Sequence, residues 1–172
     1  MIGGAIGAFI GPVHRMAAIM DGEAEFVAGA FSRNPERSSQ TGESLYIDPS
    51  RAYDSWQTML AAESARSTNE RLDFVSIVSV TSSHFEIAKA FAQAGFNVIC
   101  DKPMTLNLAQ ASELRAIVKK TNVIFTLTHN YTGYPMVKQA RHMVTQGALG
   151  EIKKIIVEYH QGWLSNHMGK DS

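Results

Sequence analysis

The sequence predicts an α/β protein built on a Rossmann-type, doubly wound parallel sheet. Short runs of apolar and β-branched residues recur along the chain, and stretches with helical spacing lie between them. Such continuously apolar strands are typical of parallel sheets, because crossover helices cover both faces of the sheet. The length of 172 residues suffices for one ordinary domain and part of another. We therefore expect strands and helices to alternate.

Four apolar runs, bounded by polar or turn residues, are the predicted strands; they cover 26–31, 74–80, 98–100 and 123–128. Only Met1 and Ile2 precede the first glycines, so we expect most of an initial strand to be missing. Residues 152–159 alternate in polarity and predict a half-exposed strand. We therefore expect one domain over 1–150 and the beginning of a second, truncated α/β domain over 151–172, in an incomplete reading frame.

The predicted helices follow the strands and are marked by apolar residues three or four positions apart. Gly95 is expected to end one helix, and Thr105 to cap the helix that follows Pro103. The spacing is carried by Ile87, Phe91 and Ala94, then by Leu114, Ile117 and Val118, then by Val137, Ala140 and Val144.

Composition excludes several classes of protein. The 16 basic and 16 acidic residues balance, which argues against a nucleic-acid partner. The apolar N-terminal run of thirteen residues is too short for a bilayer and follows no basic residue, so neither a membrane segment nor a secretory signal is expected. One cysteine, Cys100, allows no intrachain disulfide and favours the cytoplasm; we interpret it as a buried strand residue. Six histidines without ligand spacing predict no metal site.

A glycine-rich loop begins at Gly3 and leads into a predicted helix. Glycines at a strand-to-helix turn let the backbone approach a pyrophosphate, whose charge is then met by amide N–H groups at the helix N-terminus. The candidate residues are Gly3, Gly4 and Gly7, with Phe9 and Ile10 at the end of the loop. Because the spacing departs from G-x-G-x-x-G, a glycine-rich turn without a ligand is the alternative.

Ser32 and Arg33 follow the second predicted strand, where a dinucleotide site contacts the adenosine ribose. An acidic residue there would repel a 2′-phosphate, whereas serine and arginine donate hydrogen bonds to one. This pair therefore favours NADP slightly over NAD. The alternative is that Arg33 and Arg37 form a solvated surface with Glu36.

Asp101, Lys102 and Pro103 follow an apolar strand, at the sheet edge where open α/β sheets bind ligands. A lysine held there can hydrogen-bond a substrate hydroxyl. The alternative is that Lys102 only pairs with Asp101. His129 and Asn130 follow the next strand and predict a second polar cluster on the same edge.

These motifs resemble those of the glucose–fructose oxidoreductase, inositol dehydrogenase and rhizopine-catabolism (Gfo/Idh/MocA) family. The resemblance rests on the loop that ends Gly11-x-x-His14, on residues 101–103 and on 128–130, and it covers essentially the whole chain. It implies an N-terminal Rossmann domain that binds NAD(P). It also implies a C-terminal α/β domain on which sugars, cyclitols and related polyols are oxidised or reduced.

The resemblance assigns further roles by position. Lys102 corresponds to the lysine of the family's Glu-Lys-Pro motif, beside the nicotinamide and the reacting hydroxyl, and is the predicted catalytic residue. The family's Thr-Pro-Asn-x-x-His segment falls on 79–84, which adds Ser79, Thr81 and His84 to the predicted cofactor-binding residues; its proline and asparagine are lost. Thr132 replaces the arginine of Asn-x-Arg-x-x-Pro. The family's catalytic pair from the second domain has no counterpart here.

Two hypotheses follow. The first is an NAD(P)-dependent oxidoreductase that transfers a hydride between nicotinamide and a secondary hydroxyl or ketone of a carbohydrate-like substrate, and that is a homo-oligomer in its full-length form. The second is a catalytically incomplete fragment that binds dinucleotide without catalysis or does not fold stably, because its missing first strand leaves an inner edge of the sheet unpaired.

Overall fold

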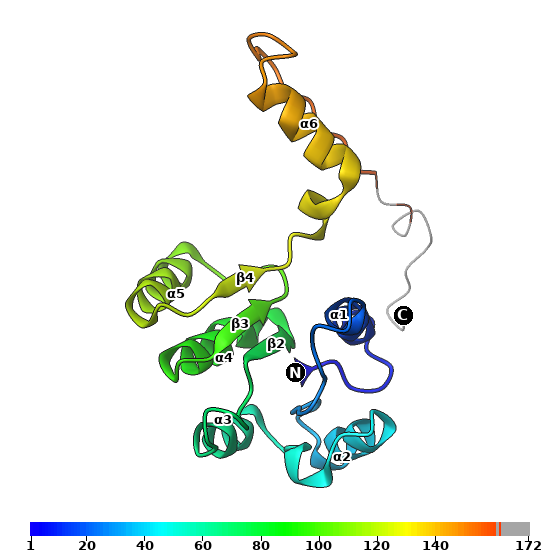
Figure 1. Cartoon of the computed structure of the whole chain (residues 1–172), viewed down its shortest axis with the longest axis vertical. Helices are drawn as coiled ribbons and strands as arrows, with labels where there is room; N and C mark the ends of the chain where they lie inside the picture. The colour runs from blue at the N-terminus through cyan, green and yellow to red at the C-terminus, as the bar shows by residue number, and fades with distance from the viewer. Residues whose placement is uncertain (161, 163–172) are drawn as a thin grey trace, which may run out of the picture. The chain divides into compact units, whose positions relative to one another are not determined.

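The computed structural model describes residues 1–160 and 162, and its central feature is a parallel sheet (Figure 1). The strands lie in the order β1-β2-β3-β4. Val75 of the second strand lies opposite Val98 of the third, in the register expected for two buried neighbours. The strands are β1 (Ile2–Gly3), β2 (Phe74–Val78), β3 (Asn97–Cys100) and β4 (Phe125–Leu127).

Beyond β1 the sheet continues only as single bridges. Ile2 pairs with Ala30, and Gly29 pairs with Ala52, both in the parallel sense. On one side of β1 the sheet is therefore extended by the bridged residues 30 and then 52, and the chain next forms β2 on the other side of β1. This reversal is the topological switch point of a doubly wound sheet, where ligands bind beyond the carboxyl ends of the strands.

Two sequence predictions about this edge differ from the structure. The expected strand over 26–31 is reduced to bridges at Gly29 and Ala30, and the pairing ends there because the Phe31 N–H donates to the Ser38 hydroxyl at 2.9 Å instead of to a neighbouring strand. The inner edge is also paired: the Gly3 N–H donates to the Ala30 carbonyl at 3.0 Å. The two residues of β1 thus bridge the two halves of the sheet.

Helices cover both faces of the sheet. Right-handed crossovers place helices that lead in opposite directions along the sheet on opposite faces, and Figure 1 shows α4 and α5 on one side and α1 on the other. The helices are α1 (Ile10–Ile19), α2 (Pro35–Ser44), α3 (Trp56–Ser64), α4 (Thr81–Gln93), α5 (Leu108–Thr121) and α6 (Pro135–Thr145), with 3₁₀ turns η1 (Pro49–Arg51) and η2 (Asn130–Gly133).

The helix ends confirm one predicted signal and correct another. Gly95, with φ of +82°, follows the C-terminus of α4 as predicted. The cap of α5 is Asn107 rather than Thr105, since the Asn107 side-chain oxygen accepts from the Gln110 N–H at 3.0 Å. The Thr105 hydroxyl donates to the Asn107 carbonyl and so supports the capping residue.

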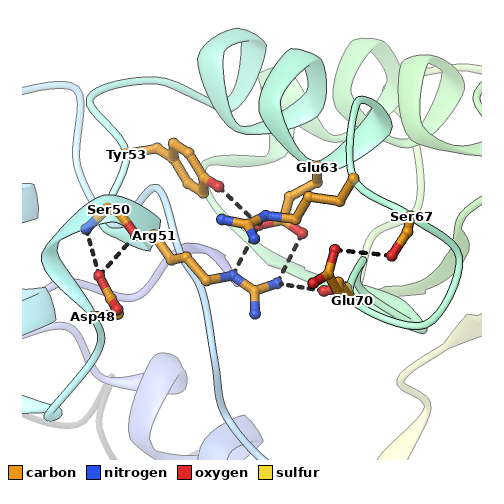
Figure 2. A network of polar contacts seen from close by, with 8 residues as sticks. Asp48, Ser50, Arg51, Tyr53, Glu63, Ser67 and Glu70 are labelled. Carbon is orange, nitrogen blue, oxygen red and sulfur yellow. Dashed lines mark hydrogen bonds and ion pairs between the residues drawn. The ribbon is translucent and has the colours of Figure 1, made fainter.

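The outer segments of the domain are held by a buried charge network (Figure 2). The Glu63 side chain of α3 is fully buried. It accepts from Arg51 Nε and Nη2 at 3.0 and 2.8 Å and from the Tyr53 hydroxyl at 2.8 Å. A buried carboxylate is tolerated only when it is paired and hydrogen-bonded in this way. The network fixes η1 and the following turn against α3.

The chain divides into two compact units, Met1–His129 and Asn130–Ser172. The second contains η2 and α6. Residues 152–159, the predicted half-exposed strand, are exposed and contain no helix or strand, because no described residue offers them a ladder of backbone partners. The predicted boundary at residue 150 stays a prediction. No helix among residues 1–160 has the length and apolar content to cross a membrane.

Candidate functional site

A glycine turn links β1 to α1 at the switch point. Gly3 and Gly4 have φ of +84° and +75°, a conformation that favours glycine. A Cβ on Gly3 would lie 2.8 Å from the Ser79 backbone nitrogen, and one on Gly11 would lie 2.5 Å from the Gly4 Cα. These glycines therefore allow backbone to pack on backbone, and they bring the turn against the loop that follows β2.

The outer side of this turn is open. Gly7 has φ of +82°, and a Cβ built on it meets no atom closer than Arg37 Nη2, at 3.8 Å. Helix α1 begins at Ile10, and the preceding residue, Phe9, provides no side-chain cap. Among the described residues no side chain accepts from the N–H groups of the first turn, and together with the bare backbone at Gly7 these groups fit an anion such as a pyrophosphate.

Three polar side chains hold the glycine turn in place, and sequence reasoning did not identify them in this role. Arg15 Nη1 donates to the Gly4 carbonyl at 2.9 Å, and Arg37 Nη2 donates to the Ile6 carbonyl at 2.7 Å. The Ile6 N–H in turn donates to the Thr41 hydroxyl at 3.2 Å. Arg37 is therefore a support of the loop rather than only part of a solvated surface.

The predicted adenosine side lies where α2 begins. The half-buried Ser32 accepts the Asn34 N–H on its hydroxyl oxygen at 3.1 Å, and Arg33 is exposed. The Asn34 side chain caps α2 by accepting the Arg37 N–H at 3.1 Å. A cavity of about 330 Å³ lies beside these residues, and its lining is Ile6, Asn34, Glu36, Arg37 and Gln40.

A buried histidine connects the two loops that follow β2 and β3. His84 Nε2 lies 2.9 Å from the Ser79 carbonyl oxygen, and Nδ1 lies 2.8 Å from the Pro103 carbonyl oxygen. The residue is 1% exposed, whereas Lys102 and Pro103 are exposed and Thr81 is half-buried. Both ring nitrogens of His84 thus face protein carbonyls. Its predicted part in cofactor binding stays a prediction, and this geometry favours an indirect one.

Asp101 is oriented by its neighbours on other strands and helices. Its carboxylate oxygen Oδ1 accepts a hydrogen bond from the Thr128 hydroxyl, with 2.7 Å between the two oxygens, and lies 3.7 Å from His14 Nε2. His14 Nδ1 lies 3.0 Å from the Ser76 hydroxyl oxygen. Over residues 1–160, no ion pair includes Lys102. The alternative that Lys102 only pairs with Asp101 is therefore not what the structure shows.

Burial shifts the pKa values of two side chains at this edge of the sheet, His14 and Cys100. Desolvation lowers the pKa of His14, and the nearby Asp101 carboxylate partly opposes that effect. Burial raises the pKa of Cys100 to about 12, so this residue is a neutral thiol and not a nucleophile at physiological pH. No group of three metal-ligating side chains is found among the described residues.

Most of the predicted site residues lie along one edge of the sheet. The glycine turn contacts the loop at 79, His84 joins that loop to the turn at 103, and Asp101 joins this turn to the end of β4. His129 is the exposed last residue of the first unit, and Asn130 is the first residue of the second. The geometry offers an open backbone turn suited to an anion at one position and an exposed lysine at another.

Comparison with known proteins identifies an NAD-binding Rossmann fold in the part of the chain that forms the parallel sheet. The model of the Gfo/Idh/MocA family, described as an oxidoreductase family with an NAD-binding Rossmann fold, matches residues 2–142. The chain is 34% identical over 171 residues to YfiI of Bacillus subtilis (strain 168), an uncharacterized oxidoreductase; the match covers 99% of this chain and 43% of that protein. A D-apiose dehydrogenase of Paraburkholderia graminis is 32% identical over 127 residues, 74% of this chain and 31% of that protein.

Among solved structures, an inositol dehydrogenase homolog from Azotobacter vinelandii, complexed with NADH and myo-inositol, is 36% identical with a TM-score of 0.84. The superposition covers 88% of this chain and 39% of that one. The chain thus spans about two fifths of the length of the first relatives that it matches.

Proposed function

This chain belongs to the Gfo/Idh/MocA family of oxidoreductases with an NAD-binding Rossmann fold, and on that premise we propose that it binds NAD(P) along the edge formed by the glycine turn and the turn at 101–103. Gly3, Gly4 and Gly7 with the start of α1 bind the pyrophosphate, and Lys102 lies at the nicotinamide end. The observation that carries the proposal is the continuous series of contacts from the glycine turn through 79 and His84 to Pro103.

We propose further that the protein interconverts a secondary hydroxyl and a ketone on a sugar, cyclitol or similar polyol. The bound nicotinamide supplies the hydride acceptor or donor. Lys102 hydrogen-bonds the reacting oxygen and balances the hydride with a proton: in reduction its ammonium gives a proton to the ketone oxygen as the hydride reaches the carbon, and in oxidation its amine takes the hydroxyl proton as the hydride leaves. Support comes from the relatives, which include a D-apiose dehydrogenase and a structure that contains myo-inositol.

We also propose a preference for NADP over NAD. Ser32 and the exposed Arg33 supply hydrogen-bond donors where the adenosine ribose is expected, and no acidic residue stands at either position. The Azotobacter vinelandii homolog was solved with NADH and, separately, with NAD+, so the proposed preference rests on Ser32 and Arg33 of this chain alone.

Calorimetric titration of the chain with NADPH and NADH tests these proposals. Both cofactors are expected to bind, NADPH more tightly, and Arg33→Ala is expected to weaken NADPH at least about tenfold while leaving NADH within about twofold, since a charge-assisted contact is worth about 1.5–3 kcal/mol. Equal affinities in the parent chain would contradict the NADP preference. Absence of binding by either cofactor would contradict the whole function.

The role of Lys102 is tested with Lys102→Met in a full-length version of the protein that carries the substrate domain of its relatives, in an assay of polyol oxidation. Turnover is expected to fall far more than cofactor affinity, because methionine keeps most of the length of the side chain but cannot donate to the reacting oxygen. An equal loss of both would contradict the catalytic role. Cofactor binding by the parent chain without turnover on any polyol would favour the alternative function, which is dinucleotide binding without catalysis.

A further inference from the structure

We propose that His84 is the positioning residue for Lys102: its buried ring holds the carbonyl of Pro103 and thereby fixes the turn that carries the lysine. This inference rests on the function proposed above. It assigns to a buried side chain a role at the nicotinamide end only.

The contacts of His84 are suited to that role. The ring is 1% exposed, at the first turns of α4, so it touches neither solvent nor a ligand bound at the surface. Its Nδ1 atom lies 2.8 Å from the Pro103 carbonyl oxygen, and its Nε2 atom lies 2.9 Å from the Ser79 carbonyl oxygen. Carbonyl oxygens only accept, so the hydrogen bond to Pro103 requires the ring proton on Nδ1, and the proposal places it there.

The turn itself has few other polar tethers. Asp101, the residue before Lys102, is bonded through its N–H to the Ile77 carbonyl and through its carboxylate to Thr128. Over the described part of the chain, the hydrogen bonds of 102–104 to another element go only through the Pro103 carbonyl, to His84. Loss of this bond frees the exposed Lys102 to sample other positions, while the glycine turn, held by Arg15 and by α2, stays in place.

Two substitutions separate the two ring nitrogens. The amide nitrogen of asparagine reaches about the position of Nδ1, and that of glutamine reaches about the position of Nε2. His84→Asn therefore keeps a donor for Pro103 and loses the one for Ser79, whereas His84→Gln does the reverse. Ile87→Val, a buried change on the same helix, is the matched control for a loss of core packing alone.

The test is calorimetric titration of the 172-residue chain and these variants with NADH and with ADP, which lacks the nicotinamide. His84→Gln is expected to weaken NADH about fivefold to tenfold, because NADH must then select the ordered turn from a mobile one, and to leave ADP within about twofold. His84→Asn and Ile87→Val are expected to bind both ligands within about twofold of the parent chain. Parallel losses for NADH and ADP, or equal behaviour of the two His84 variants, would overturn the proposal.

Nuclear magnetic resonance gives a readout that requires neither a ligand nor a substitution. The parent chain is expected to show a His84 ring N–H proton that exchanges slowly with water, and a rapidly exchanging ring would overturn the proposal. The Lys102 amide signal is expected to shift in His84→Gln and not in His84→Asn. If the parent chain binds no nucleotide, the proposed function fails, while these signals still decide whether His84 positions the turn.

Discussion

Replacing Gly7 with alanine separates cofactor binding from folding. Gly7 has φ of +82°, and an added Cβ meets no atom closer than 3.8 Å. The cost to the fold is therefore limited to the left-handed conformation of an L-residue, about 1–2 kcal/mol. Gly22, with φ of +70° and no atom within 4 Å of its built Cβ, gives the matched control, because Gly22→Ala introduces the same strain away from the glycine loop.

The effect on the cofactor is expected to be much larger for Gly7→Ala. The new methyl group stands where the proposed pyrophosphate approaches the backbone, and each lost hydrogen bond to a charged group is worth about 1.5–3 kcal/mol. At 1.4 kcal/mol for each factor of ten, the affinity for NADPH is expected to fall about tenfold to hundredfold. Calorimetry measures the affinity, and thermal unfolding without ligand measures stability. Equal NADPH affinities in Gly7→Ala and Gly22→Ala would refute the assignment of the pyrophosphate to this turn.

Two further predictions concern titratable side chains that are buried in whole or in part, Glu63 and His14. Glu63→Gln is expected to lower the free energy of unfolding by about 3 kcal/mol in urea titrations, because it leaves the Arg51 guanidinium without its counter-charge; a loss below about 1 kcal/mol would contradict the importance of this network. The folded-state pKa of His14 lies below its unfolded value of 6.5, so its contribution to stability is present above pH 6.5 and is lost as the pH falls through the lower folded value. His14→Asn is expected to flatten that part of the stability profile, and an unchanged slope would show that His14 does not titrate in this way.

The parts of the fold that follow from hydrophobic pattern could be predicted from the sequence. The buried strands β2 and β3 are mostly apolar, and α4 and α5 carry apolar residues on one face at helical spacing. Helix α2 could not be found in this way, because its sequence is almost entirely polar. Its signals were local: Asn34 is its cap and Pro35 its first residue.

Interactions between distant residues were not predictable from the sequence. The glycine loop and the Asp-Lys-Pro segment could be recognised from the sequence as the two ends of the candidate site. Glycine allows a phosphate to approach the backbone, and lysine can hydrogen-bond a substrate hydroxyl. Nothing in the pattern showed that Arg15 and Arg37 would hold the glycine turn, or that the His84 ring would reach Pro103. Those contacts depend on side-chain directions that are fixed only when the helices pack on the sheet.

The most direct test of the central claim is a crystal structure of the chain grown with NADPH. The pyrophosphate is expected on the N–H groups at Gly7 and the start of α1, with the nicotinamide ring beside Lys102. A pyrophosphate bound elsewhere, or a nicotinamide directed away from Lys102, would contradict the account.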